Sequence, residues 1–97
     1  ALDDILAIDG IDCVFIGPAD LAADMGHLGN AGHPEVRAAV LDALARIAAS
    51  GKAAGMLSTE EGFIADCVKA GARFVGVGID VVAYVGAMRT LARKYVR

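Results

Sequence analysis

Short, continuous apolar runs alternate along the chain with longer segments in which apolar residues recur every three or four positions. The runs cover Cys13–Ile16, Ala53–Leu57 and residues 73–78, and runs of this length are typical of strands buried on both faces. A segment with helical periodicity follows each run. The pattern therefore predicts the order β, α, β, α, β, α, with parallel strands joined by right-handed helical crossovers.

The strongest helical pattern begins at Pro34, a residue well suited to the first position of a helix. We expect this helix to end near Gly51 and to carry an apolar stripe at spacings of four and three residues. The stripe consists of Val36, Val40, Leu44 and Ile47. His33, directly before the proline, is interpreted as a helix-entry residue rather than as a catalyst.

Two further helices are predicted after the second and third strands. Ser58, with Glu61 three residues later, has the form of a capping box, and Asp80 is placed to cap the last helix. We interpret both as caps; the alternative for Asp80 is a supporting role at the mouth of a barrel. The apolar stripes of these helices are Ile64, Cys67 and Val68, and then Val81, Val85, Met88, Leu91, Ala92 and Tyr95.

The segments before Pro34 are less regular. Residues 1–8 resemble the end of an amphipathic helix, so we expect the chain to start within an element that begins upstream. After the first strand, residues 21–25 can form a helical turn opened by Asp20, and a glycine-rich irregular loop follows.

Composition indicates a folded but incomplete unit. With 57% hydrophobic and 22% charged residues, the chain is too apolar to be disordered, and we expect one unit over residues 1–97 without an internal boundary. A unit of this size buries only about 60–65% of its unfolded surface. Three strands with helices on one side also leave one face and two edges open, which favours closure by more chain or by another subunit.

Charge and cysteine usage exclude several classes of function. A net charge of −3, without a basic stripe, argues against a nucleic-acid partner. No apolar stretch reaches the length of a membrane span, and no targeting signal is present, so we expect a cytoplasmic protein without a membrane partner. Cys13 and Cys67 lie in apolar surroundings without metal-ligand spacing and are interpreted as buried thiols.

Ligands of parallel α/β folds bind at the carboxyl ends of the strands, both in open doubly wound sheets and in closed barrels. Both architectures fit the alternation, and both direct attention to residues 17–21, 56–58 and 78–80. In the first segment, Gly17 lets the backbone approach a ligand, and free amides at the start of a short helix can hold an anion. Asp20 is either a ligand of a hard divalent cation or only a helix cap.

The motif Gly-Ile-Asp-Cys-Val-Phe-Ile-Gly-Pro-Ala-Asp-Leu-Ala at residues 10–22, with Gly-Asn-Ala-Gly-His-Pro-Glu-Val at residues 29–36, resembles the HpcH/HpaI aldolase family. These are enzymes of the 4-hydroxy-2-oxo-heptanedioate type. The similarity continues through residues 51–57 and 71–80 in the same order. The resemblance implies an α/β chain that forms the C-terminal segment, strands six to eight with their helices, of a (β/α)8 TIM-type barrel.

The resemblance also implies roles for four residues. In the family, a divalent metal cation, commonly Mg2+, Mn2+ or Co2+, is held by a Glu and by the Asp of the Gly-Pro-Ala-Asp motif, which makes Asp20 a metal ligand here. Gly17 and Ala19 match backbone contacts to the pyruvate carboxylate, and Leu57 matches a wall of the aldehyde pocket. The family's Glu ligand would fall before residue 1.

No catalytic residue is assigned in this chain. The family's base and its pyruvate-binding Arg come from earlier loops of the barrel, so the role of base is not transferred to His27 or His33. Ser58 is interpreted as a cap rather than a nucleophile because no base accompanies it. Residues 76–78 lack the third glycine of a dinucleotide-binding fingerprint.

The resemblance implies a class II aldolase that forms or cleaves 4-hydroxy-2-oxo acids, with pyruvate enolate as nucleophile and an aldehyde as acceptor. A metal acting as Lewis acid suits this chemistry, but with one metal ligand we expect the chain alone to be inactive.

One alternative is a CoA-thioester lyase of the citrate lyase β or malyl-CoA lyase branch, against which Pro18 argues. Another is a non-catalytic assembly fragment, because the family forms homo-oligomers, dimers or hexamers, through the last helix. A phosphate site is disfavoured because no Lys or Arg directly follows the last two strands.

Overall fold

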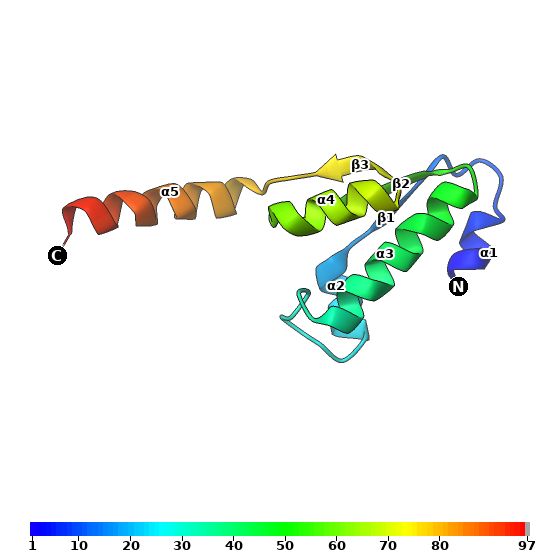
Figure 1. Cartoon of the computed structure of the whole chain (residues 1–97), viewed down its shortest axis with the longest axis horizontal. Coiled ribbons are helices and arrows are strands. Elements are labelled where there is room, and N and C mark those ends of the chain that lie inside the picture. Colours follow the sequence, from blue (N-terminus) through cyan, green and yellow to red (C-terminus); the bar gives the residue numbers. More distant parts are fainter. Residues whose placement is uncertain (97) are drawn as a thin grey trace.

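The computed structural model describes residues 1–96, in which helices and strands alternate around one small sheet (Figure 1). The predicted order of strands and helices is confirmed. The elements are α1 (Leu2–Leu6), β1 (Cys13–Ile16), α2 (Pro18–Asp24), α3 (Pro34–Ala49), β2 (Ala53–Leu57), α4 (Glu61–Ala70), β3 (Ala72–Gly76) and α5 (Asp80–Tyr95). The first two strands have the predicted bounds, whereas β3 lies slightly earlier than predicted and ends at Gly76.

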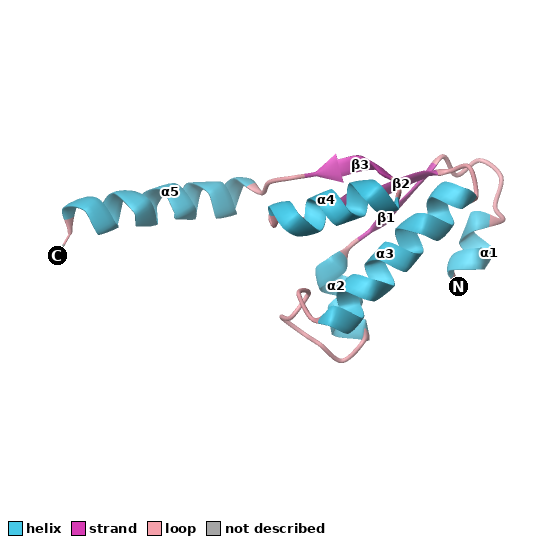
Figure 2. Ribbon diagram, in the orientation of Figure 1, coloured by secondary structure: helices cyan, strands magenta, loops and turns pink. Residues whose placement is uncertain are grey.

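The three strands are parallel, as predicted, and they lie in the order β1-β2-β3 in the sheet. Cys13 pairs with Ala53 at the start of β1, and an irregularity between Ala54 and Gly55 shifts the register of β2 against β3. The crossover from β1 to β2 contains α3 and the crossover from β2 to β3 contains α4 (Figure 2). The α/β class with a parallel sheet is therefore confirmed.

The core lies between the sheet and the helices α3 and α4. All four residues of the predicted α3 stripe, Val36, Val40, Leu44 and Ile47, are completely buried. Burying an aliphatic side chain of this size contributes about 1.5–3 kcal/mol, so α3 is the central element of the core. The other buried hydrophobic residues are Ala22, Ala54, Met56, Phe63, Cys67 and Ala72.

The buried face of α4 differs from the predicted one. Cys67 is buried as expected, but Val68 is 52% exposed and Ile64 is only partly buried. Phe63 takes their place, because residues four apart share one helix face. The helix is thus rotated relative to the prediction, and the Phe63 ring contacts Arg37 of α3, whose guanidinium carbon lies 5.0 Å from the ring centre.

The helix starts confirm one predicted cap and correct another. His33 is the N-cap of α3, as predicted, and its Nδ1 accepts a hydrogen bond of 3.1 Å from the Glu35 amide. The capping box at Ser58 is wrong: α4 has Glu60 at its N-cap position, without a side-chain cap. The Ser58 hydroxyl instead accepts a 3.1 Å hydrogen bond from the Glu60 amide and closes a turn before the helix.

Two aspartates also lie inside the helices that they were expected to open or cap. The helix α2 begins at Pro18, earlier than predicted, so Asp20 belongs to its first turn. Asp80 is the first residue of α5, and its Oδ1 accepts a 2.8 Å hydrogen bond from the Val81 amide. Proline at the first helical position fixes the start of α2, because its backbone angle is already helical and it has no amide hydrogen to leave unpaired.

The face of the sheet opposite the helices is open in the described part of the chain. Phe15 is 48% and Phe74 is 63% exposed, and Cys13 is exposed as well. The prediction of strands buried on both faces, and of a buried Cys13 thiol, is therefore wrong for residues 1–96, because no second layer covers this side. The two phenylalanine rings meet edge to face, with centres 5.9 Å apart, beside Gly55, where a Cβ atom would lie 2.7 Å from the Phe15 ring.

The last helix, α5, extends away from the body of the molecule (Figure 1) and contains no buried residue. The longest dimension of the described chain is consequently 57 Å. The predicted apolar stripe of α5 is solvent-accessible, with Val81 60% and Tyr95 80% exposed. Across residues 1–96, no helix combines the length and apolar character needed to span a membrane.

Candidate functional site

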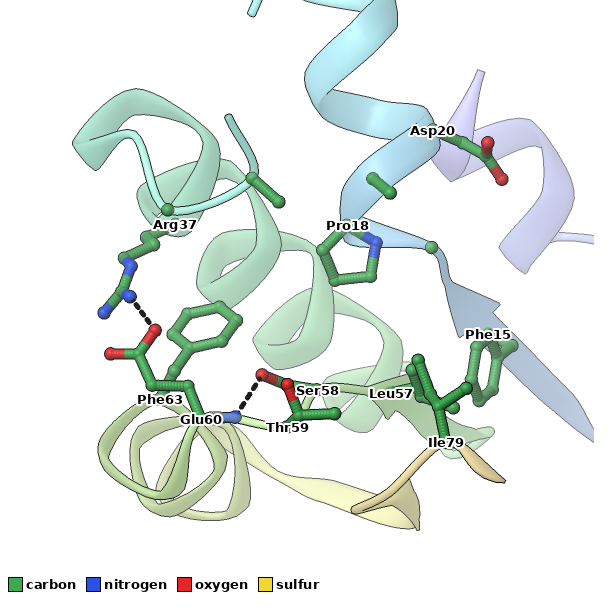
Figure 3. Close-up of a pocket in the computed structure, with 14 residues that line it drawn as sticks. Phe15, Pro18, Asp20, Arg37, Leu57, Ser58, Thr59, Glu60, Phe63 and Ile79 are labelled. Atoms are coloured by element: carbon green, nitrogen blue, oxygen red, sulfur yellow. Dashed lines mark hydrogen bonds and ion pairs between the residues drawn. The ribbon is translucent and has the colours of Figure 1, made fainter. Parts of the chain in front are cut away.

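A pocket of about 450 Å3 lies at the carboxyl ends of β1 and β2 (Figure 3). All four residues that the sequence singled out, Gly17, Ala19, Asp20 and Leu57, line it. Parallel α/β folds bind their ligands at this end of the sheet. The other lining residues are Phe15, Pro18, Ala31, Gly32, Arg37, Ser58, Thr59, Glu60, Phe63 and Ile79.

One wall of the pocket is the turn from β1 into α2. Gly17 is the N-cap of α2, and its carbonyl accepts a 2.9 Å hydrogen bond from the Leu21 amide. A Cβ atom at position 17 would lie 3.3 Å from Asp20 Oδ2, a tight contact that glycine avoids. The Ala19 and Asp20 amides belong to the first turn, where helix geometry provides no partner for the N–H groups. The turn therefore presents free amides beside an acidic side chain.

The Asp20 side chain lies at the border between this pocket and a second hollow of about 520 Å3 beside α1 and α3. Within residues 1–96 its carboxylate forms no ion pair. Figure 3 shows it on the opposite side of the pocket from Arg37. An exposed carboxylate without a basic partner fits one position of a hard divalent cation, which prefers about six oxygen ligands.

Within residues 1–96, Asp20 belongs to no group of three or more His, Cys or acidic side chains close enough to share a metal ion. The only group of three His, Cys or acidic side chains that gathers within residues 1–96 consists of His27, His33 and Glu35, and none of these lines the pocket. A ready-made set of three ligands around Asp20 is therefore not present within residues 1–96.

A second wall is apolar and centres on Leu57, the last residue of β2. Leu57 packs against the backbone of the neighbouring strand at Gly76, where a Cβ atom would lie 2.8 Å from Leu57 Cδ1. Phe15 and Ile79 line the same pocket as Leu57 (Figure 3). This wall can contact an apolar or carbonyl-bearing part of a ligand but supplies no titratable group.

A third wall was not predicted from the sequence. Arg37 of α3 forms an ion pair with Glu60 at the start of α4 and lies over the Phe63 ring. Its Nε is buried and has no hydrogen-bond partner among the described residues. Position 37 lies off the apolar stripe of α3, so periodicity placed it on the solvent side. No local signal links positions 37 and 60, because the pair forms only when α3 packs against α4.

Comparisons with known proteins identify the family to which the chain is similar. The sequence profile of the family described as HpcH/HpaI aldolase/citrate lyase matches residues 1–87. Over 94 residues, the chain is 49% identical to the hydroxypyruvate/pyruvate aldolase of Roseobacter denitrificans, an alignment that covers 97% of this chain and 37% of that protein. It is 48% identical to the 4-hydroxy-2-oxo-heptane-1,7-dioate aldolase of Klebsiella pneumoniae, with coverage of 97% and 36%.

A solved structure is similar as well. The crystal structure of an HpcH/HpaI aldolase/citrate lyase family protein from Burkholderia cenocepacia superposes with a TM-score of 0.84 at 36% sequence identity. The match covers 96% of this chain and 36% of that one. The chain thus spans about a third of the length of the relatives that it matches.

Proposed function

The chain belongs to the HpcH/HpaI aldolase/citrate lyase family, and from this membership we propose that it is the segment of strands six to eight of a (β/α)8-barrel class II aldolase. The enzyme forms or cleaves 4-hydroxy-2-oxo acids, with a 2-oxo acid such as pyruvate as nucleophile and an aldehyde as acceptor. Relatives that share 48–49% sequence identity with the chain are named aldolases, which are carbon–carbon lyases. The uncovered face of the sheet and the unpaired outer edges of β1 and β3 within residues 1–96 support a place within a larger closed sheet.

The observation that carries this proposal is the meeting of Gly17, Ala19, Asp20 and Leu57 around one pocket at the strand ends. Asp20 supplies one carboxylate ligand to a divalent cation, Mg2+, Mn2+ or Co2+. When bound, such a cation supplies Lewis-acid stabilisation of the negative charge that develops on a 2-oxo acid. The role of Asp20 is to hold the cation beside the helix start, not to move a proton.

The turn into α2 orients the 2-oxo acid. Backbone amides at Gly17 and Ala19 can donate hydrogen bonds to the substrate carboxylate, as amides at helix starts do for anions. Leu57, on the neighbouring strand, then limits the space on the aldehyde side and keeps water from it. No described residue in the pocket is assigned as the base, so the proton transfer at C3 is expected to use a group contributed from elsewhere in the barrel.

The proposal is tested with a chimeric enzyme, called the graft, and with one substitution in it. The chain replaces the matching third of the Roseobacter denitrificans aldolase, and pyruvate release from a 4-hydroxy-2-oxo acid is measured with Mn2+ or Mg2+ and with a chelator. We expect metal-dependent activity that Asp20→Asn lowers by roughly a hundred-fold or more, because a ligand of the Lewis acid is lost. The chain alone should be weak or inactive, since one carboxylate leaves most coordination positions to water.

The matched control is Asp24→Asn, which removes a charge from the end of the same helix but does not touch the pocket. It should leave the activity of the graft unchanged. Full activity in the presence of a chelator, or equal losses with the two variants, would contradict the role of Asp20.

The family description also names citrate lyase, which supports a second candidate, a lyase acting on CoA thioesters. Free 4-hydroxy-2-oxo acids and CoA thioesters tested on the same graft distinguish the two. Turnover of thioesters alone would replace the aldolase proposal with this one.

A further inference from the structure

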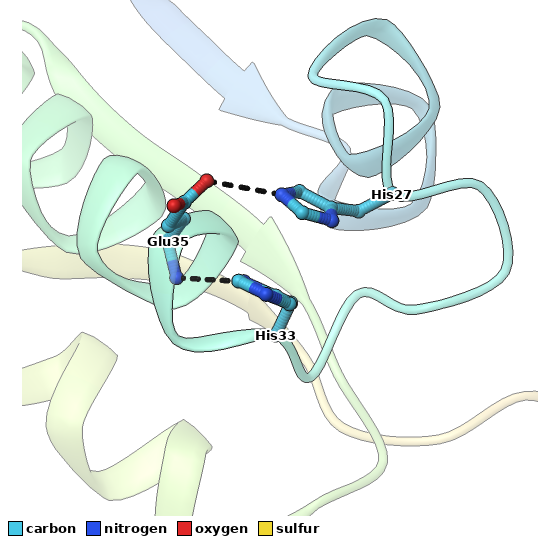
Figure 4. Close-up of side chains that lie close together, drawn as sticks. All are labelled: His27, His33 and Glu35. Atoms are coloured by element: carbon cyan, nitrogen blue, oxygen red, sulfur yellow. Dashed lines mark hydrogen bonds and ion pairs between the residues drawn. The ribbon is translucent and has the colours of Figure 1, made fainter.

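A separate cluster of three side chains lies in the loop between α2 and α3 and at the start of α3 (Figure 4). His27, His33 and Glu35 each offer a ligand atom, and these atoms all lie within 4.8 Å of one another. His27 Nε2 lies 3.0 Å from Glu35 Oε2. The two imidazole rings are stacked, with centres 3.8 Å apart and planes at 16°.

Backbone hydrogen bonds hold both histidines in place. The His27 amide donates to the Ala22 carbonyl over 2.7 Å. The His27 carbonyl accepts from the Asn30 amide over 2.9 Å. The His33 amide in turn donates to the Asn30 carbonyl over 3.1 Å. The His33 carbonyl accepts from the Arg37 amide over 3.0 Å. The loop therefore consists of two consecutive closed turns, anchored at His27 and at His33. Such preorganisation lowers the entropy lost when a ligand binds.

We propose that His27, His33 and Glu35 form a binding site for a divalent transition-metal cation of the Zn2+ or Co2+ type. Two imidazole nitrogens and one carboxylate are a set that such cations prefer, with metal–ligand distances of about 2.0–2.2 Å. Ligand atoms up to 4.8 Å apart must approach one another by about 1 Å to share one ion at these distances. Side-chain rotation of Glu35, which is 70% exposed, and of the histidines can supply this movement.

The charge of the cluster suits a cation. Glu35 contributes the acidic oxygen of the set, and its Oε2 lies 3.0 Å from His27 Nε2. One interaction opposes binding, because the positive end of the α3 dipole lies at His33. The Glu35 carboxylate, in the first turn of the same helix, compensates for it.

Metal binding also exchanges two hydrogen bonds for coordination bonds. His27 Nε2 now donates to Glu35 Oε2, so it must lose this proton, or leave the coordination to Nδ1, before His27 can ligate an ion. His33 Nδ1 now accepts from the Glu35 amide, so its ring proton is on Nε2. Coordination through either nitrogen requires the ring to give up this bond, by using the Nδ1 lone pair or by moving the proton to Nδ1. The cap of α3 should therefore change when the cation binds, and a shift of the Glu35 amide resonance reports it.

The site is distinct from the one at Asp20 and does not rest on the proposed aldolase activity. The experiment uses the 97-residue chain without a histidine tag. Zn2+ binding is measured by calorimetry, and Co2+ binding by the visible absorption of the bound ion. We expect one saturable site that His27→Phe and His33→Asn each weaken by at least about ten-fold, since even indirect loss of support to a metal ligand has that effect.

The variants are chosen to keep the fold. His27→Phe retains a flat ring in the loop but has no nitrogen, and His33→Asn retains a residue that can cap α3. Glu61→Gln, which removes an exposed carboxylate outside the cluster and outside the pocket, is the control and should leave Zn2+ affinity unchanged. Absence of saturable binding, equal affinities in the histidine variants and the unmodified chain, or a loss caused only by Glu61→Gln would overturn the proposal. If circular dichroism shows that His33→Asn disturbs α3, His27→Phe decides the outcome.

Discussion

Gly71 is a position where both the backbone conformation and a close neighbour oppose a side chain. It ends α4 in the left-handed region, with φ of 116°, and a Cβ atom there would lie 2.7 Å from the Ala48 Cβ of α3. A side chain therefore meets both backbone strain, about 1–2 kcal/mol, and a collision between two helices. We expect Gly71→Ala to lower the free energy of unfolding by about 2–4 kcal/mol in a urea titration.

The control for that substitution is Gly62→Ala. Gly62 lies in the first part of the same helix, and a Cβ atom there would have no neighbour within 4 Å among the described residues. Alanine should therefore stabilise the helix by up to about 1 kcal/mol. Equal effects of the two substitutions would contradict the steric account of Gly71.

The two cysteines should differ in reactivity and in their effect on stability. Burial, helped by the Asp66 charge, raises the pKa of the Cys67 thiol above its ordinary value of 9.0, whereas Cys13 is exposed. A raised pKa in the folded state means that folding disfavours the thiolate. Stability is therefore fully present below pH 9.0 and falls as pH rises through the folded-state pKa.

We expect an aromatic disulfide reagent to label Cys13 at once and Cys67 only as the fold opens. Denaturant titrations from about pH 7 to about pH 10 should show a loss of stability that Cys67→Ala removes in part. Equal labelling rates of the two thiols would contradict the burial of Cys67.

The pocket residues divide into those that sequence could identify and those that it could not. Gly17, Asp20 and Leu57 were identifiable because each lies at or just after the end of an apolar run, where parallel strands present their ligands. Arg37 and Glu60 were not, because their pairing depends on how α3 packs against α4. The assignment of chemical roles to the first group still rests on the family resemblance.

At the scale of elements, α3 should contribute most of the core energy and α5 almost none. Leu44 is completely buried, whereas Leu91 of α5 is 48% exposed. Leu44→Ala should cost about 2–5 kcal/mol, because it removes buried surface and leaves a cavity. Leu91→Ala should change stability by less than about 0.5 kcal/mol. Thermal unfolding of the two variants checks this, and similar melting temperatures would contradict it.

The success of the sequence prediction also varied between elements. The stripe of α3 was correct because four strongly apolar residues define only one face. In α4 two overlapping stripes were possible, and Phe63 with Cys67 forms the buried one. Strand positions were predictable from apolar runs, but the open face was not, because a run of apolar residues does not say whether a second layer covers it.

At the scale of the molecule, the exposed apolar stripe of α5 should promote association. We expect sedimentation velocity to show oligomers that increase with concentration, because isolated apolar faces of this kind bury surface by pairing. Met88→Glu, on the stripe, should shift the distribution toward monomer. Thr90→Glu, which adds the same charge off the stripe, should not. A monomer at all concentrations would argue against assembly through the last helix.

The parallel order of the strands sets an order of folding. Cys13 pairs with Ala53, 40 positions away, whereas Ala54 pairs with Ala72, only 18 positions away. Each doubling of a loop adds about 0.6 kcal/mol to the cost of closing it, so β2 and β3 should associate first and β1 should join last. The turn that follows β1 carries Gly17, Ala19 and Asp20. The pocket is then completed late in folding, and detachment of one edge strand would dismantle it while the helical core persists.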